Sequence, residues 1–158
     1  MPQERSVNVE RIFISPARGV AQLERETISV KGGMGIVGDR NFGKAVHPGQ
    51  NLTLIEAEEI ELFCEAHFLN RDLSLLRRNL VTRGVKLNSL LNVEFTISGV
   101  RLRGVELCEP CVLVGNSLSG ESLSPAEVIK HWLHRGGLRA DVLSDGYVVR
   151  GARIEIGA

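Results

Sequence analysis

Two cysteines separated by two residues have the clearest chemical potential in this sequence. The segment Cys108-Glu109-Pro110-Cys111 follows an alternating apolar run, Val100–Leu107, and therefore lies at the end of a predicted strand. A thiolate is a nucleophile and a soft metal ligand, and the proline would present Cys111 from a rigid turn. A thioredoxin-type redox pair needs a helix N-terminus, whereas Val112–Val114 predicts a further strand. On spacing alone, a buried pair without chemistry is an equally good interpretation.

A structural zinc site is a second interpretation of the cysteines. Cys64 and His67 together with Cys108 and Cys111 would provide three thiolates and one imidazole, a set that binds zinc. However, Cys64 and His67 fall on the apolar stripe of a helix predicted over Glu56–Leu69. Residues on such a stripe usually belong to the core, so zinc is the less favoured interpretation.

Arginines occur next to glycines or asparagines in two further segments. Gly38-Asp39-Arg40-Asn41 lies between other glycines, and Arg77-Arg78-Asn79 precedes a predicted strand that Arg83-Gly84 closes. Guanidinium groups bind phosphate or carboxylate in a bidentate manner, and glycines let backbone amides approach an anion. Any one of these arginines is more readily interpreted as a solvated loop charge. Their joint occurrence predicts a pocket for an anionic ligand.

The elements that must position these residues are mostly short strands. Apolar residues alternate with a period of two and are separated by Gly, Ser, Asn or Asp turns. The predicted strands include 7–14, 27–30, 52–55, 79–82, 93–97, 100–107, 140–143, 147–149 and 153–156. A second helix is predicted from Ser124, because Ser124-Pro125-Ala126-Glu127 matches a capping box with proline in the first turn. The pattern predicts one mainly β domain over residues 1–158, a barrel or sandwich with two helices.

Composition excludes some classes of function. The 158 residues contain 19 basic and 19 acidic side chains, and only 4% are aromatic, so no nucleic-acid partner is expected. The first residues lack the charged and apolar regions of a signal peptide, and no apolar run is long enough to cross a membrane. An odd count of three cysteines favours reduced thiols and a cytoplasmic location.

The order of the motifs resembles that of MOSC domains, the family named for the C-terminal part of molybdenum-cofactor sulfurase. The motifs are Gly38–Asn41, Arg77–Leu87, Leu107–Cys111, and Arg135–Leu143 followed by Gly146. The resemblance spans about residues 7–156 and implies the compact β-barrel-like fold of that family. The chain departs from the family pattern at Gly151-Ala152 and at Asn92-Val93-Glu94, which we interpret as turn variations.

The resemblance also implies a site. Cys111 matches the reactive cysteine of the short stand-alone members, which would be the catalytic residue and the molybdenum ligand if the metal is bound. Asp39, Arg40, Arg77 and Asn79 match regions that contribute to the ligand pocket, and Arg83 closes the same motif. The implied cofactor is the molybdenum cofactor, a phosphate-bearing pterin. Cys108 has no firm role in the family.

Two functions fit this resemblance, and both use Cys111. The favoured one is a sulfur carrier and cofactor-binding domain that takes sulfane sulfur from a cysteine desulfurase or another donor. The residues include no pyridoxal-phosphate desulfurase portion, so the donor is expected to be separate. The alternative is a molybdenum-dependent reductase of N-hydroxylated compounds that receives electrons from a separate reductase. A non-catalytic β-barrel that binds another anion or structural zinc is the third possibility.

Overall fold

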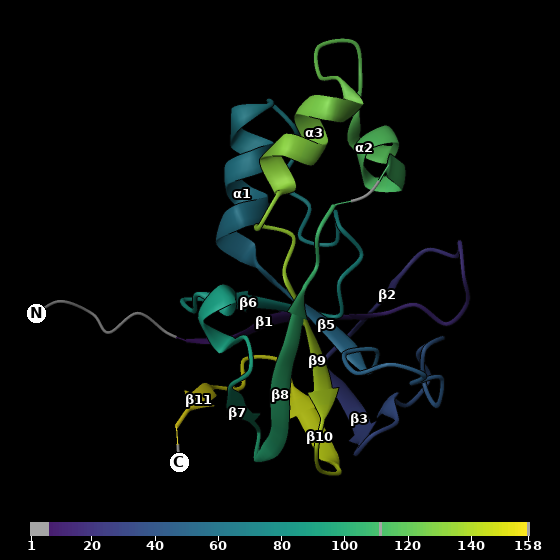
Figure 1. Cartoon of the computed structure of the whole chain (residues 1–158), viewed down its shortest axis with the longest axis vertical. Helices are drawn as coiled ribbons and strands as arrows, with labels where there is room; N and C mark the ends of the chain where they lie inside the picture. Colours follow the sequence, from purple (N-terminus) through teal and green to yellow (C-terminus); the bar gives the residue numbers. More distant parts are fainter. Residues whose placement is uncertain (1–6, 111, 158) are drawn as a thin grey trace, which may run out of the picture.

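A curled β-sheet forms the body of the molecule, and three helices gather at one end of it (Figure 1). The computed structural model describes residues 7–110 and 112–157. The strands are β1 (Asn8–Ile14), β2 (Leu23–Arg25), β3 (Thr27–Lys31), β4 (Gly35–Ile36), β5 (Leu52–Glu56), β6 (Leu80–Arg83), β7 (Glu94–Ile97), β8 (Val100–Leu107), β9 (Leu138–Val142), β10 (Gly146–Val149) and β11 (Ile154–Ile156). The helices are α1 (Ala57–Ala66), α2 (Val112–Leu118) and α3 (Pro125–Trp132), with a 3-10 turn at Leu87–Leu90.

The strands form two sheets within the described residues. The larger has eight strands in the order β11-β7-β8-β9-β5-β6-β1-β2, and the smaller has three in the order β10-β3-β4. All pairings are antiparallel except β5 with β6, which are parallel and connected through α1. The mainly β, barrel-like fold predicted from the period-two pattern is confirmed.

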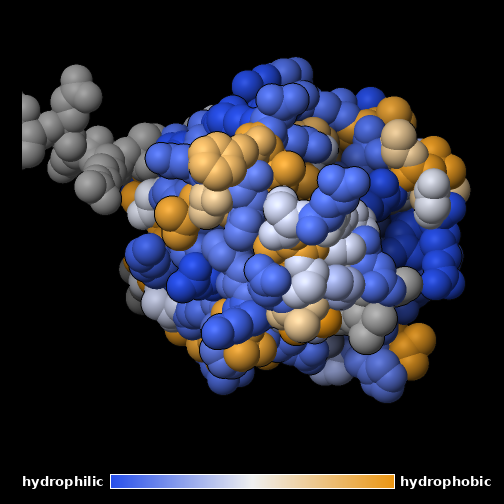
Figure 2. All heavy atoms as spheres, turned by 90° about the horizontal axis from the view of Figure 1, so that it is seen from above, coloured by the Kyte–Doolittle hydropathy of each residue, from blue (hydrophilic) through white to orange (hydrophobic). Residues whose placement is uncertain are grey.

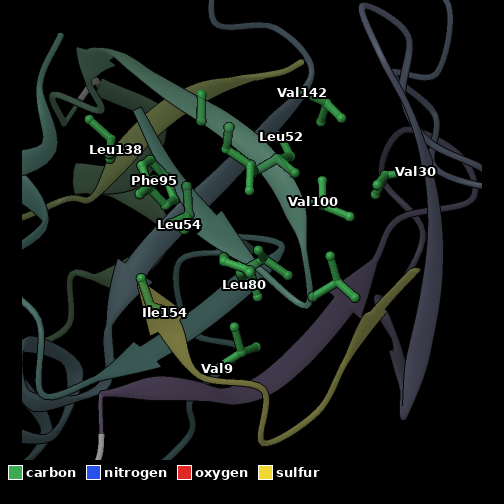
Figure 3. Close-up of a cluster of buried hydrophobic side chains, with 14 of the residues drawn as sticks. Val9, Val30, Leu52, Leu54, Leu80, Phe95, Val100, Leu138, Val142 and Ile154 are labelled. Carbon is green, nitrogen blue, oxygen red and sulfur yellow. The ribbon is translucent and has the colours of Figure 1, made fainter. Parts of the chain in front are cut away.

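The main core lies inside the curl of the sheet. Buried side chains from most strands meet there, among them Leu54, Leu80, Phe95 and Leu138 (Figure 3). Strand β8 shows why the sequence folds this way, since Val100 and Leu102 are buried while Arg101 and Arg103 are exposed. Alternation therefore places one face of the strand against the core and leaves the other for solvent.

A second core fixes the helices to the sheet. Phe63 of α1 and Trp132 of α3 are fully buried and their rings lie 5.2 Å apart. The predicted capping box begins α3, because the Ser124 hydroxyl accepts a hydrogen bond from the Glu127 amide at 3.2 Å. The outer surface of the helical end is mainly hydrophilic with separate apolar patches (Figure 2). None of the helices in the described part of the chain is long and apolar enough to span a membrane.

The strand predicted at Val112–Val114 is wrong, because this segment is the start of helix α2. A Cβ on Gly115 would lie 3.0 Å from the Ile129 side chain and from the Pro125 carbonyl oxygen, so α2 packs closely on α3. This tertiary packing overrides the β propensity of valine and leucine. The short strands β2 and β4, the helix α2 and the 3-10 turn are the elements that the sequence pattern did not predict.

The buried carboxyl of Glu56, at the junction of β5 and α1, makes stability depend on pH. Burial raises the pKa of Glu56 above its ordinary value, although Lys86 opposes the shift. Folding therefore favours the neutral carboxyl, and the stability it contributes at low pH is lost as the pH rises through the folded-state pKa. Gln at this position still offers an acceptor to the Leu87 amide, which lies 3.4 Å from Oε2.

We therefore expect Glu56→Gln to raise the free energy of unfolding at pH 8 and to have a smaller effect at pH 4. Urea unfolding at the two pH values measures the difference. An equal gain at both values would show that ionisation of Glu56 is not the cause.

Candidate functional site

A polar pocket of about 460 Å³ opens beside the junction of the sheet and the helical end. That volume lies within the usual range for small-molecule sites. Its walls come from segments far apart in the sequence: the loop after β4, the start of β5, the turn before β6, α2 and β9. The lining residues are Ser15, Asp39, Arg40, Asn41, Gly49, Gln50, Leu52, Thr53, Leu76, Arg77, Arg78, Asn79, Val114 and Arg139.

Four arginines and one aspartate line this arginine pocket, so its formal charge is strongly positive. Arg77 has a left-handed backbone, with φ 57°, and its Nη2 donates to the Val20 carbonyl at 2.6 Å. The neighbouring Arg78 donates from Nε to the Gly136 carbonyl at 3.0 Å. A carbonyl partner orients a guanidinium without cancelling its charge, so the Arg77 group keeps its attraction for an anion.

Asp39 and Asn79 are buried and hold the pocket together. Asp39 Oδ1 accepts from the Ser15 amide at 2.9 Å, and Oδ2 accepts from the Asn41 amide at 3.1 Å. Asn79 donates to the Phe13 carbonyl at 3.1 Å and accepts from the Thr53 amide at 3.1 Å. These bonds fix the loop that carries Arg40 against strands β1 and β5. The two side chains therefore position the pocket through the backbone that they bind.

We expect Asn79→Ala to lower the free energy of unfolding by about 2–3 kcal/mol, because it leaves the part-buried Thr53 amide and the buried Phe13 carbonyl without these hydrogen bonds. Chemical denaturation measures this loss. The matched control is Asn88→Ala, which removes one exposed hydrogen bond to the His134 carbonyl and should cost less than about 1 kcal/mol. Equal losses in the two variants would contradict the positioning role of Asn79.

The cysteine motif reaches the same region. Cys108 is only 2% exposed, and burial raises the pKa of its thiol although Arg78 and Arg139 oppose the shift. Its amide donates to the Gly137 carbonyl at 2.8 Å. The predicted reactive residue, Cys111, lies outside the described residues. Helix α2 begins at the next position, and its Val114 lines the arginine pocket.

The acid between the two cysteines connects the motif to the end of α3. Glu109 Oε2 accepts from the His134 amide at 3.1 Å, and Oε1 lies 3.0 Å from His134 Nδ1. The backbone of His134 is left-handed, with φ 62°. This contact places the motif beside the same helical end that carries α2.

The structure brings Asp39, Arg40, Arg77 and Asn79 to one pocket, but it places Arg83 elsewhere. The Arg83 guanidinium forms ion pairs with Glu10 at 2.8 Å and with Glu61 at 2.9 Å, and it is not among the residues that line the pocket. Its two carboxylate partners come from β1 and α1, so the tertiary fold separates it from the other predicted ligand residues.

The zinc interpretation finds no support in residues 7–110 and 112–157, where no three His, Cys, Asp or Glu side chains could together hold a metal. Cys64 is 3% exposed and belongs to the core around Phe63. His67 lies with its ring 4.7 Å from that phenylalanine ring.

Arg139 was not predicted as a site residue. It lies in β9 between the buried Leu138 and Ala140, so the alternation of the strand turns its side chain away from the core. The alternation of apolar and polar residues was the sequence signal that could have identified Arg139 as a site residue, because an arginine on the outer face of a strand end can reach a pocket. Arg139 Nε lies 4.0 Å from Oε1 of Glu106, with which it forms an ion pair.

The profile of the MOSC domain family matches residues 41–155, which is most of the sequence. The chain belongs to the MOSC domain family. Comparison with curated proteins finds no match.

Solved structures share the fold of this MOSC domain. It resembles YuaD from Bacillus subtilis with a TM-score of 0.80 and 19% identity, covering 96% of each chain. It also resembles YiiM from Escherichia coli, with a TM-score of 0.66 and 16% identity over 99% of this chain and 71% of that one. For YiiM from Geobacillus stearothermophilus the TM-score is 0.70 and the identity is 12%, with 96% of this chain and 75% of that chain covered. At these identities the likeness concerns the fold.

Proposed function

We propose that this MOSC domain binds the molybdenum cofactor in the arginine pocket and carries sulfane sulfur on Cys111. The observation that carries the proposal is the convergence of four arginines, from three distant segments, on one pocket beside the helix that begins directly after Cys111. MOSC domains are associated with the molybdenum cofactor, and the pocket offers the chemistry that such a group requires.

The residues of the pocket suit a phosphate-bearing pterin. Arg40, Arg77, Arg78 and Arg139 would hold the phosphate, because guanidinium forks match its oxygens. Asn41 and Gln50 add amide groups that can pair with the polar edge of a pterin ring. When bound, the cofactor supplies a metal centre that exchanges sulfur or electrons.

The proposed sulfur step needs only a thiolate and a persulfide donor. The Cys111 thiolate attacks the outer sulfur of a donor persulfide, R–S–SH, and forms a new S–S bond. The S–S bond of the donor breaks, and the donor leaves as the thiolate R–S⁻. The product is Cys111–S–SH, and no external oxidant or reductant is consumed. Positive charge beside a cysteine favours its thiolate, and the proposal places Cys111 next to the arginine pocket.

The test is to incubate the purified protein anaerobically with a cysteine desulfurase and cysteine, and to analyse it by peptide mass spectrometry and elemental analysis. We expect the Cys111 peptide to gain the mass of one sulfur atom. Addition of the molybdenum cofactor should give bound molybdenum, and Arg40→Ala should weaken that binding. Arg103→Ala is the matched control, because Arg103 is exposed on β8 outside the pocket lining.

Each result separates the functions. Sulfur on Cys111 with transfer to an acceptor supports the carrier. The reductase function would replace the carrier function if the protein binds stoichiometric molybdenum that N-hydroxylated compounds reoxidise, and if Cys111 gains no sulfur. If the protein acquires neither sulfur on Cys111 nor bound molybdenum, the proposal is overturned.

A further inference from the structure

An apolar groove of about 160 Å³ runs between α2 and the turn that precedes β6. Leu75 and Leu76 form one wall, and Val114 and Leu118 form the other. Leu75, Val114 and Leu118 also pack against the core of the helical end, so both walls are anchored. The turn itself is ordered, because Asp72 Oδ1 accepts from the Ser74 amide at 2.9 Å and from its hydroxyl at 2.6 Å.

The groove is continuous with the arginine pocket. Leu76, Arg77 and Val114 line both of them. The apolar walls therefore end where Arg77 begins the charged surface. One small molecule can occupy both sites only if it combines an apolar part with a negatively charged part.

The size and lining of the groove define the apolar part. A leucine-lined cavity of about 150 Å³ holds one benzene molecule, so this groove has room for one ring or a short alkyl chain. Ser117 and Arg77 are its only lining residues with polar side chains within the described part of the chain, and both are exposed. A polar group deep in the groove would lose hydration without finding partners on the leucine walls.

We propose that the groove binds the apolar group of a small organic anion whose charged group lies in the arginine pocket. This inference rests on the arginine pocket of the proposed function and adds a second class of ligand, which the site takes when the cofactor is not bound: an amphiphilic anion with a single ring or short chain. Affinity comes from the guanidinium groups, and selectivity comes from the apolar surface that the groove removes from water.

Phenyl phosphate and inorganic phosphate are the probes that test this proposal, with binding to the full chain measured by isothermal titration calorimetry. We expect phenyl phosphate to bind on the order of tenfold more tightly, because part of its ring is buried in the groove. Ser117→Phe should fill the groove and remove this advantage without changing the affinity for inorganic phosphate. Asn116→Phe is the matched control, since Asn116 is the exposed neighbour on α2 that does not line the groove.

The outcomes distinguish this inference from the proposed function. If phosphate binds and phenyl phosphate binds no more tightly, the groove proposal is overturned while the arginine pocket stands. The groove proposal is also overturned if Ser117→Phe keeps the full advantage, or if Asn116→Phe removes it equally. If neither ligand binds, the arginine pocket fails as an anion site, and the groove proposal fails with it.

Discussion

Replacement of Cys111 by serine is expected to lower sulfur transfer at least about a thousandfold, because a hydroxyl at neutral pH is almost never ionised and cannot carry sulfane sulfur. The measurement is transfer of labelled sulfur from a cysteine desulfurase to the protein, followed by circular dichroism to show that the fold is retained.

Cys108→Ala is the matched control within the same motif. Cys108 is 2% exposed and burial raises the pKa of its thiol, so it is a poor nucleophile at neutral pH. Alanine avoids placing an unpaired hydroxyl in its buried position. We expect this variant to keep most of its sulfur transfer. Full activity of Cys111→Ser, or equal loss in both variants, would remove Cys111 from the mechanism.

The largest expected effect on stability comes from Gly137→Ala. Gly137 has φ 106°, and a Cβ there would collide with the carbonyl oxygen of Leu54. Leu54 is paired with Leu80 on one side and Leu138 on the other, so the β5 backbone has little freedom to move. Steric overlap and the left-handed backbone together should cost about 3–5 kcal/mol, a large share of the stability of a typical domain.

Gly99→Ala separates the two contributions. Gly99 has φ 77° in the turn between β7 and β8, and nothing lies within 4 Å of an added Cβ. Only backbone strain applies, so we expect a loss of about 1 kcal/mol. Urea unfolding of both variants gives the comparison. A similar small loss at Gly137 would mean that β5 can shift to admit a methyl group.

Regular local patterns made much of the fold predictable from the sequence. Val100–Leu107 forms β8 with the predicted boundaries, although its register against β9 shifts between Gly104 and Glu106. Ser124 caps α3 as its motif predicts. Helix α2 was missed because the helical state of Val112–Leu118 depends on packing against α3, which no local pattern shows. The strands β2 and β4 are short and exist through their pairing with β1 and β3.

The site was predictable where the motifs supply both charge and a turn. Arg40 and Arg77 line the pocket as expected from their loops, whereas Asp39 and Asn79 turn out to hold backbone groups in place. Arg83 has the same local signal, but carboxylates from β1 and α1 bind it. Which partner an arginine meets depends on the tertiary fold, and spacing along the chain does not determine it.

The position of β5 in the large sheet has a consequence for biosynthesis. Its neighbours are β6 on one side and β9 on the other, and β9 is formed by Leu138–Val142, far after β5 in the sequence. During translation, the centre of the sheet therefore stays open until Leu138–Val142 has left the ribosome. A nascent or truncated chain that ends before Leu138 exposes the edges of β5 and β8, and exposed edges pair with other chains. Such fragments should depend on chaperones to stay unaggregated.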